Sequence, residues 1–88
     1  MAVRQNFAAL SKAGRDKGRF FAVLEVCEGY ALIADGELRP LSKPKRKNLR
    51  HLGATNHRFA PQDLASDAAL RSAIAQRFGS VGGPSKEG

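Results

Sequence analysis

Apolar residues of this chain gather in short runs that are separated by glycine-containing turns. Residues 7–10 form a short apolar start. The stretch from Arg19 to Cys27 is rich in phenylalanine and valine, which is typical of a strand that is covered on both faces. A Glu28-Gly29 turn leads into a second apolar run from Tyr30 to Ala34. Both of these longer runs are predicted to be β-strands.

A hairpin is predicted directly after the second run, at Asp35-Gly36, because this pair suits a type I′ turn with positive φ at both central residues. The return strand is predicted over Glu37 to Ser42, in a segment whose prolines suit the edge of a sheet. Alternation from Lys47 to Leu52 predicts a further short strand. Several short strands joined by tight turns predict a mainly β fold, in the form of a small antiparallel barrel.

The spacing becomes helical after Pro61. A serine and an aspartate at positions 66 and 67 can cap a helix that ends at Gly79. Three apolar residues at intervals of four form one stripe along this helix: Leu70, Ile74 and Phe78. The helix is expected to cover an open side or end of the barrel, with docking of the stripe on a partner as the alternative.

These patterns divide the chain into a barrel over residues 1–60, a C-terminal helical extension over 61–79 and a tail over 80–88. The tail has no apolar pattern and is rich in glycine, so disorder is predicted there.

The length of 88 residues bounds the function, because one small domain cannot enclose a cofactor in a multilayer scaffold. Its lone cysteine cannot form an internal disulfide. No apolar run approaches the roughly 20 residues of a membrane-spanning helix, and no secretion signal is recognisable. A cytoplasmic protein is expected.

Charge changes this picture, since 15 lysines and arginines stand against 8 aspartates and glutamates. The stretch from Leu38 to Gln62 holds seven of the basic residues and no acidic one. A second group of four basic residues surrounds Asp16: Lys12, Arg15, Lys17 and Arg19. Net positive charge alone is compatible with binding to a polyanion, with binding to an acidic membrane surface or with a role in solubility only. Two separate basic runs favour a face that binds phosphates.

No candidate catalytic site emerges from the reactive residue types. Cys27, His51 and His57 do not have the spacing of metal ligands, and Cys27 is expected to be a buried, inert thiol. The glycines of residues 14–18 do not form a phosphate-binding P-loop. Asp16 is expected to accept backbone N–H groups within its own turn. The sequence therefore predicts no enzyme activity, no metal and no cofactor.

The segment from Ser11 to Val26, with Gly-Arg-Asp-Lys-Gly at its centre, resembles the KOW motif, in which a glycine-bearing loop joins two β-strands. The match continues through residues 34–39 and 43–52 to Thr55-Asn56. The chain is thus similar to small bacterial KOW-domain RNA-binding proteins and, through them, to the L14e-type family of large-subunit ribosomal proteins. Members of that family usually begin with a Gly-x-Val strand, where this chain has residues 4–7.

The resemblance implies an SH3-like barrel, monomeric when free, that contacts structured ribosomal RNA through basic loops and performs no catalysis. Carried over to matching positions, it implies two groups of RNA-binding residues. The first comprises Lys12, Arg15, Lys17 and Arg19, and the second Lys43, Lys45, Arg46, Lys47, Asn48, Arg50 and His51.

Two other functions stay open on the sequence. One is a protein–protein interaction module that uses the apolar helix stripe or an aromatic groove, because SH3-like barrels also bind peptides. The other is a nucleic-acid-binding factor of transcription or translation that is not part of the ribosome. Because Phe20, Phe21 and Tyr30 fall in predicted core strands, recognition of RNA shape is favoured over stacking on single-stranded bases.

Overall fold

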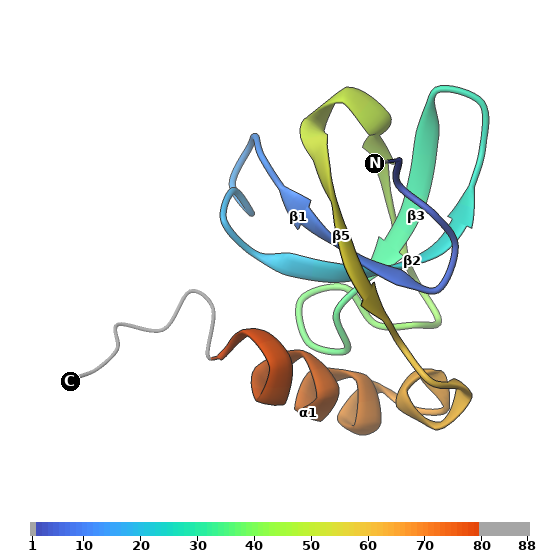
Figure 1. The fold of residues 1–88 in the computed structure, drawn as a ribbon, viewed down its shortest axis with the longest axis vertical. Coiled ribbons are helices and arrows are strands. Elements are labelled where there is room, and N and C mark those ends of the chain that lie inside the picture. The colour runs from blue at the N-terminus through green and yellow to red at the C-terminus, as the bar shows by residue number, and fades with distance from the viewer. Residues whose placement is uncertain (1, 80–88) are drawn as a thin grey trace, which may run out of the picture.

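The computed structural model describes residues 2–79, which form one antiparallel sheet of five strands and a C-terminal helix. The strands are β1 (Phe7–Ser11), β2 (Phe20–Val26), β3 (Tyr30–Ala34), β4 (Lys45–Asn48) and β5 (Leu52–Arg58). Two short 3₁₀ turns, η1 (Leu49–His51) and η2 (Pro61–Leu64), precede β5 and the helix α1 (Asp67–Phe78). Figure 1 shows the strands curling around one another while α1 lies along one end of the sheet.

The predicted mainly β fold with one C-terminal helix is confirmed, but closure of the sheet into a barrel is not. The strand order is β4-β3-β2-β1-β5, so β4 and β5 are the two outer strands of an open sheet. They follow one another in the chain with only η1 between them.

The sheet buries apolar residues on both faces because side chains alternate along each strand. One alanine from each of β1, β2 and β3 faces the helix, and these small side chains admit Leu70 and Ile74 of α1. This first core cluster consists of Ala8, Ala22, Ala34, Phe59, Leu70 and Ile74. The second, on the other face, consists of Ala9, Phe21, Val23, Ala31, Ile33 and Leu52. β2 contributes to both clusters, which explains its nearly continuous apolar sequence.

The helix matches its prediction in position and in role. Ser66 caps it by accepting a hydrogen bond from the amide of Ala69 at 3.1 Å. Leu70 and Ile74 are buried, and the ring of Phe78 stacks on Phe20 with 3.9 Å between centroids. The apolar stripe therefore packs within the molecule, and it does not offer the free docking face of the alternative.

The hairpin after β3 departs from its prediction. Gly36 has a positive φ of 79° but Asp35 does not, so the turn is not type I′. The Asp35 carboxylate instead accepts hydrogen bonds from the backbone amides of Glu37 and Arg39, at 2.9 Å each. These bonds wind the chain into an irregular turn, so the strand predicted over residues 37–42 is absent.

The return strand is β4, which begins later, at Lys45, and pairs with β3. The strand predicted over residues 47–52 is also wrong, because those residues contain the end of β4, all of η1 and the start of β5. β5 could not be predicted from strand propensity, because it contains glycine, alanine and asparagine, which are uncommon in strands. Pairing with β1 forms this strand, aided by the Thr55 hydroxyl, which donates to the Ala8 carbonyl at 2.8 Å.

Three smaller expectations have different outcomes. The Glu28-Gly29 turn is confirmed. Cys27 lies just beyond β2 and is half-buried, so it is not the core thiol that was expected. The tail over residues 80–88 falls outside the described residues. Within residues 2–79, no helix has both the length and the apolar character needed to cross a membrane.

Gly36 offers a test of how the 35–44 segment meets α1. A Cβ atom at Gly36 would collide with the backbone carbonyl of Asp67, whereas one at Gly29 would meet nothing within 4 Å. Both glycines have a positive φ, 79° and 85°, so alanine costs about 1 kcal/mol in backbone strain at either site. We expect Gly36→Ala to lower the free energy of unfolding by about 3 kcal/mol in urea titrations, because overpacking adds to the strain. An equal loss in Gly29→Ala would contradict this packing.

Candidate nucleic-acid interface

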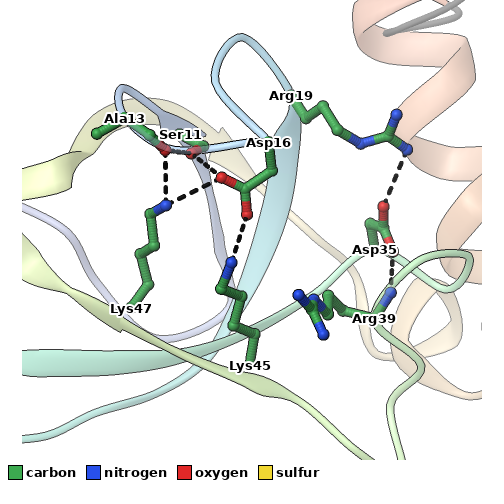
Figure 2. Close-up of polar contacts among 8 residues, drawn as sticks. All are labelled: Ser11, Ala13, Asp16, Arg19, Asp35, Arg39, Lys45 and Lys47. Atoms are coloured by element: carbon green, nitrogen blue, oxygen red, sulfur yellow. Dashed lines mark hydrogen bonds and ion pairs between the residues drawn. The ribbon is translucent and has the colours of Figure 1, made fainter.

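A buried carboxylate lies at the centre of the basic region. Asp16, in the loop between β1 and β2, is 6% exposed. Its Oδ1 accepts hydrogen bonds from Ser11 Oγ at 2.7 Å and Lys47 Nζ at 2.9 Å, and its Oδ2 accepts one from Lys45 Nζ at 3.2 Å. Figure 2 shows the two lysines reaching up from β4 to this loop, where Lys47 also donates to the Ala13 carbonyl at 2.8 Å. We call Ser11, Asp16, Lys45 and Lys47 the Asp16 cluster.

The local sequence makes this geometry possible. Gly14 and Gly18 have φ angles of 83° and 91°, a backbone conformation that glycine adopts at little cost. Within the loop, the amide of Gly18 donates to the Ser11 carbonyl at 2.8 Å. The prediction that the Asp16 carboxylate accepts backbone N–H groups of its own turn is wrong, because side chains of Ser11 and β4 fill that role.

The hydrogen bonds determine the charge state of Asp16. Burial by itself raises the pKa of this carboxyl group, but hydrogen bonds from Lys47, Ser11 and Lys45 outweigh burial and hold the pKa well below its usual range. The carboxylate is therefore ionised at neutral pH. It compensates part of the positive charge of the two lysines within the fold.

A second contact joins the two basic stretches at their other ends. The amide of Lys12 donates to the carbonyl of His51 at 2.8 Å, and Ser11 pairs with Leu52 in the sheet. A Cβ atom on Gly53 would lie 3.6 Å from Lys12 Cδ, so the Lys12 side chain runs beside the start of β5. Residues 12–19 and 43–51 are thus adjacent in space although about 30 positions separate them in the chain.

Six of the nine predicted lysines and arginines are exposed and form no ion pair with any of residues 2–79. We call these six the basic face: Lys12, Arg15, Lys17, Lys43, Arg46 and Arg50. Arg46 has one further contact, because its guanidinium lies 4.0 Å from the centroid of the Tyr30 ring. Side chains alternate along β4, so Arg46 points to the opposite side of the sheet from Lys45 and Lys47 and is exposed.

The structure uses the other five predicted residues internally. Lys45 and Lys47 belong to the Asp16 cluster. Arg19 is half-buried, and its Nη2 pairs with the carboxylates of Asp35 at 3.2 Å and Glu37 at 3.4 Å.

Asn48 and His51 complete this internal group. The Asn48 side chain caps η1 by accepting from the amide of Arg50 at 3.1 Å. His51 is half-buried, and its carbonyl bonds to Lys12 as described above. Both residues shape the turn that presents Arg50.

One basic residue near the site was missed. Arg39 is exposed and lines a hollow together with Arg15 and Lys45. Arg39 belongs to the basic stretch from Leu38 to Gln62 but also to the predicted return strand, so it is not among the predicted binding residues. Its position in the charge run was the only available signal.

Cationic side chains dominate the surface of this region. Across residues 2–79, no three side chains of histidine, cysteine, aspartate or glutamate come together as metal ligands.

A scan against models of known protein families and a search of curated proteins both give no match. The KOW resemblance therefore stays a prediction.

The Asp16 carboxylate provides a test through pH. Because its pKa is lower in the folded than in the unfolded state, its stabilisation is complete above the unfolded pKa, near 4, and is lost as the pH falls below that value. We expect Asp16→Asn to lower the free energy of unfolding at pH 7 by about 3 kcal/mol, since it removes the counter-charge of a buried pair.

Urea titrations between pH 2.5 and 7 measure this difference. The difference in the free energy of unfolding between wild type and Asp16→Asn should become smaller as the pH falls below about 4. Glu28→Gln, at an exposed position without an ion pair, is the matched control and should follow the wild-type profile. A gap that stays constant down to pH 2.5 would argue against an ionised, paired Asp16.

Proposed function

We propose that this protein is a non-catalytic RNA-binding protein, associated with the ribosome, which binds structured ribosomal RNA through the basic face. One observation carries the proposal: the Asp16 cluster holds two basic stretches side by side and leaves six cationic side chains exposed, with no acidic partner among residues 2–79. Exposed lysines and arginines neutralise backbone phosphates and release their counterions. The resemblance to KOW-domain proteins supports RNA as the polyanion and the ribosome as its location.

The aromatic residues support recognition of folded RNA over stacking on bases. All six aromatic residues of the chain are buried or partly buried. Phe21 and Phe59 are buried in the core, while Phe20 and Phe78 stack on each other. The remaining two, Phe7 and Tyr30, carry the guanidinium groups of Arg4 and Arg46 over their rings. Proteins that bind single strands without sequence preference use open aromatic platforms, whereas double-stranded RNA is recognised mostly by its shape.

Salt dependence tests the electrostatic basis of binding. If about five phosphates are contacted, affinity for a labelled RNA hairpin should fall by roughly 10²- to 10³-fold between 50 and 200 mM salt. Fluorescence anisotropy at several salt concentrations gives the slope. A flat response would show that the basic face does not bind phosphates.

Charge removal tests the location of binding. We expect the triple variant Lys12→Gln, Lys17→Gln, Arg50→Gln to weaken hairpin binding by about 30-fold or more at 100 mM salt, and to reduce the salt slope by about one for each lost phosphate contact. These side chains are exposed and form no ion pair with the rest of residues 2–79, so the melting temperature should hardly change.

The matched control removes the same charge elsewhere. Arg58, Arg71 and Arg77 are also exposed, and they lie at the end of β5 and on α1. Their triple substitution by glutamine should change affinity only a few-fold, through long-range attraction. Equal losses in both triple variants would mean that net charge, not the basic face, determines binding.

The ribosomal part of the proposal is tested in cells. Crosslinking of the protein to RNA, followed by sequencing, should recover large-subunit ribosomal RNA. Recovery of other RNAs alone would favour a nucleic-acid-binding factor outside the ribosome.

A further inference from the structure

A hollow of about 360 Å³ lies between the Gly14–Gly18 loop and the 35–44 segment, at one side of the Asp16 cluster. Its volume falls within the range of small-ligand sites, roughly 300 to 1,000 Å³. It combines cationic and apolar side chains in one place. The lining residues are Arg15, Asp16, Phe21, Leu38, Arg39 and Lys45.

The charge of the hollow suits an anion. Among the described residues that line it, only Asp16 is acidic, and hydrogen bonds from Lys45 and Lys47 already occupy that carboxylate. Arg15 and Arg39 form no ion pair with any of residues 2–79. In Figure 2 the Arg39 side chain extends away from Asp35 toward Lys45. Two guanidinium groups, which suit the bidentate binding of phosphate, thus line the same hollow without an acidic partner.

An apolar surface lies beside these cations. Leu38 is 59% exposed, the most exposed of the large hydrophobic residues over residues 2–79. Hydrogen bonds hold the backbone next to Leu38, because the amide of Arg39 donates to the Asp35 carboxylate at 2.9 Å, and the Arg39 carbonyl accepts from the amides of Asp35 and Gly36 at 3.0 and 3.2 Å. Leu38 therefore presents an apolar side chain at the edge of a cationic hollow.

We infer that this hollow binds one unpaired nucleotide of the RNA, with its phosphate between Arg15 and Arg39 and its base against Leu38. A nucleotide combines these two chemistries, an anionic phosphate and a flat apolar base, at a short distance from each other. The inference rests on the proposed function and deepens it. The basic face holds the paired parts of the RNA, and the hollow selects RNA in which one nucleotide is free to leave the helix.

Two RNA hairpins of otherwise identical sequence test this inference with the full chain, one fully paired and one with a single bulged nucleotide. We expect wild type to bind the bulged hairpin about tenfold more tightly at 100 mM salt. Leu38→Ser should remove most of that preference while leaving affinity for the paired hairpin unchanged. Leu38→Met should keep it, because methionine offers a similar apolar surface.

The chain provides matched controls for both kinds of contact. Val26, at the end of β2, is also exposed, at 40%, and it does not line the hollow, so Val26→Ser should keep the preference. Arg39→Gln should reduce the preference, whereas Arg77→Gln on α1 should not. All four positions are exposed, so the melting temperatures should stay near that of wild type.

The outcomes separate this inference from the proposed function. Equal binding of both hairpins by wild type would overturn the nucleotide site and leave RNA binding by the basic face intact. The same conclusion would follow if Leu38→Ser kept the preference, or if Arg77→Gln reduced it as much as Arg39→Gln. Binding of neither hairpin at 50 mM salt would reject the proposed function itself.

Discussion

The Asp16 carboxylate, buried among three hydrogen-bond donors, determines how the basic part of this protein is arranged. A buried carboxylate is unfavourable unless it is paired, and here Lys45 and Lys47 supply two of its three partners. They lie 29 and 31 positions away in the chain, so one side chain joins the β1–β2 loop to an outer strand of the sheet. The lysines that make this link are taken from the basic run itself.

Within one basic stretch, Lys45 and Lys47 are paired inside the fold whereas Arg46 is exposed. A loop that carried only exposed cations would be opened by their mutual repulsion. The Asp16 cluster compensates part of the charge inside the fold, while neighbouring side chains such as Arg15 and Arg46 remain outside. Positive charge is thus kept dense on the surface without loss of a fixed loop conformation. Such a surface suits the proposed recognition of RNA through its shape and its phosphates.

The sequence predicted those parts of the fold that depend on local patterns. β2, β3 and α1 have strong apolar periodicity or a capping residue, and each was placed within one or two residues of its position in the structure. The 35–44 segment and β5 depend on tertiary contacts instead. The Asp35 side chain binds two amides of its own turn, and β5 forms because β1 offers a pairing edge. Neither cause can be read from propensity.

The candidate site shows the same limit at the level of single residues. Composition located the two basic stretches, but it could not tell Lys47, which is 7% exposed, from its exposed neighbour Arg46. Alternation of side chains along β4 makes that distinction, but only once the start of the strand at Lys45 is known. Arg39 and Leu38 were missed because the segment that orders them was predicted as a strand.

We propose that the Asp16 cluster unites two distant stretches into one RNA-binding surface, and NMR tests this proposal directly. In a titration of ¹⁵N-labelled protein with an RNA hairpin, amide signals of residues 12–19 and 43–51 should shift together, with one common dissociation constant. Signals of α1 away from this surface should stay in place. Shifts confined to one of the two stretches, or centred on α1, would contradict the claim.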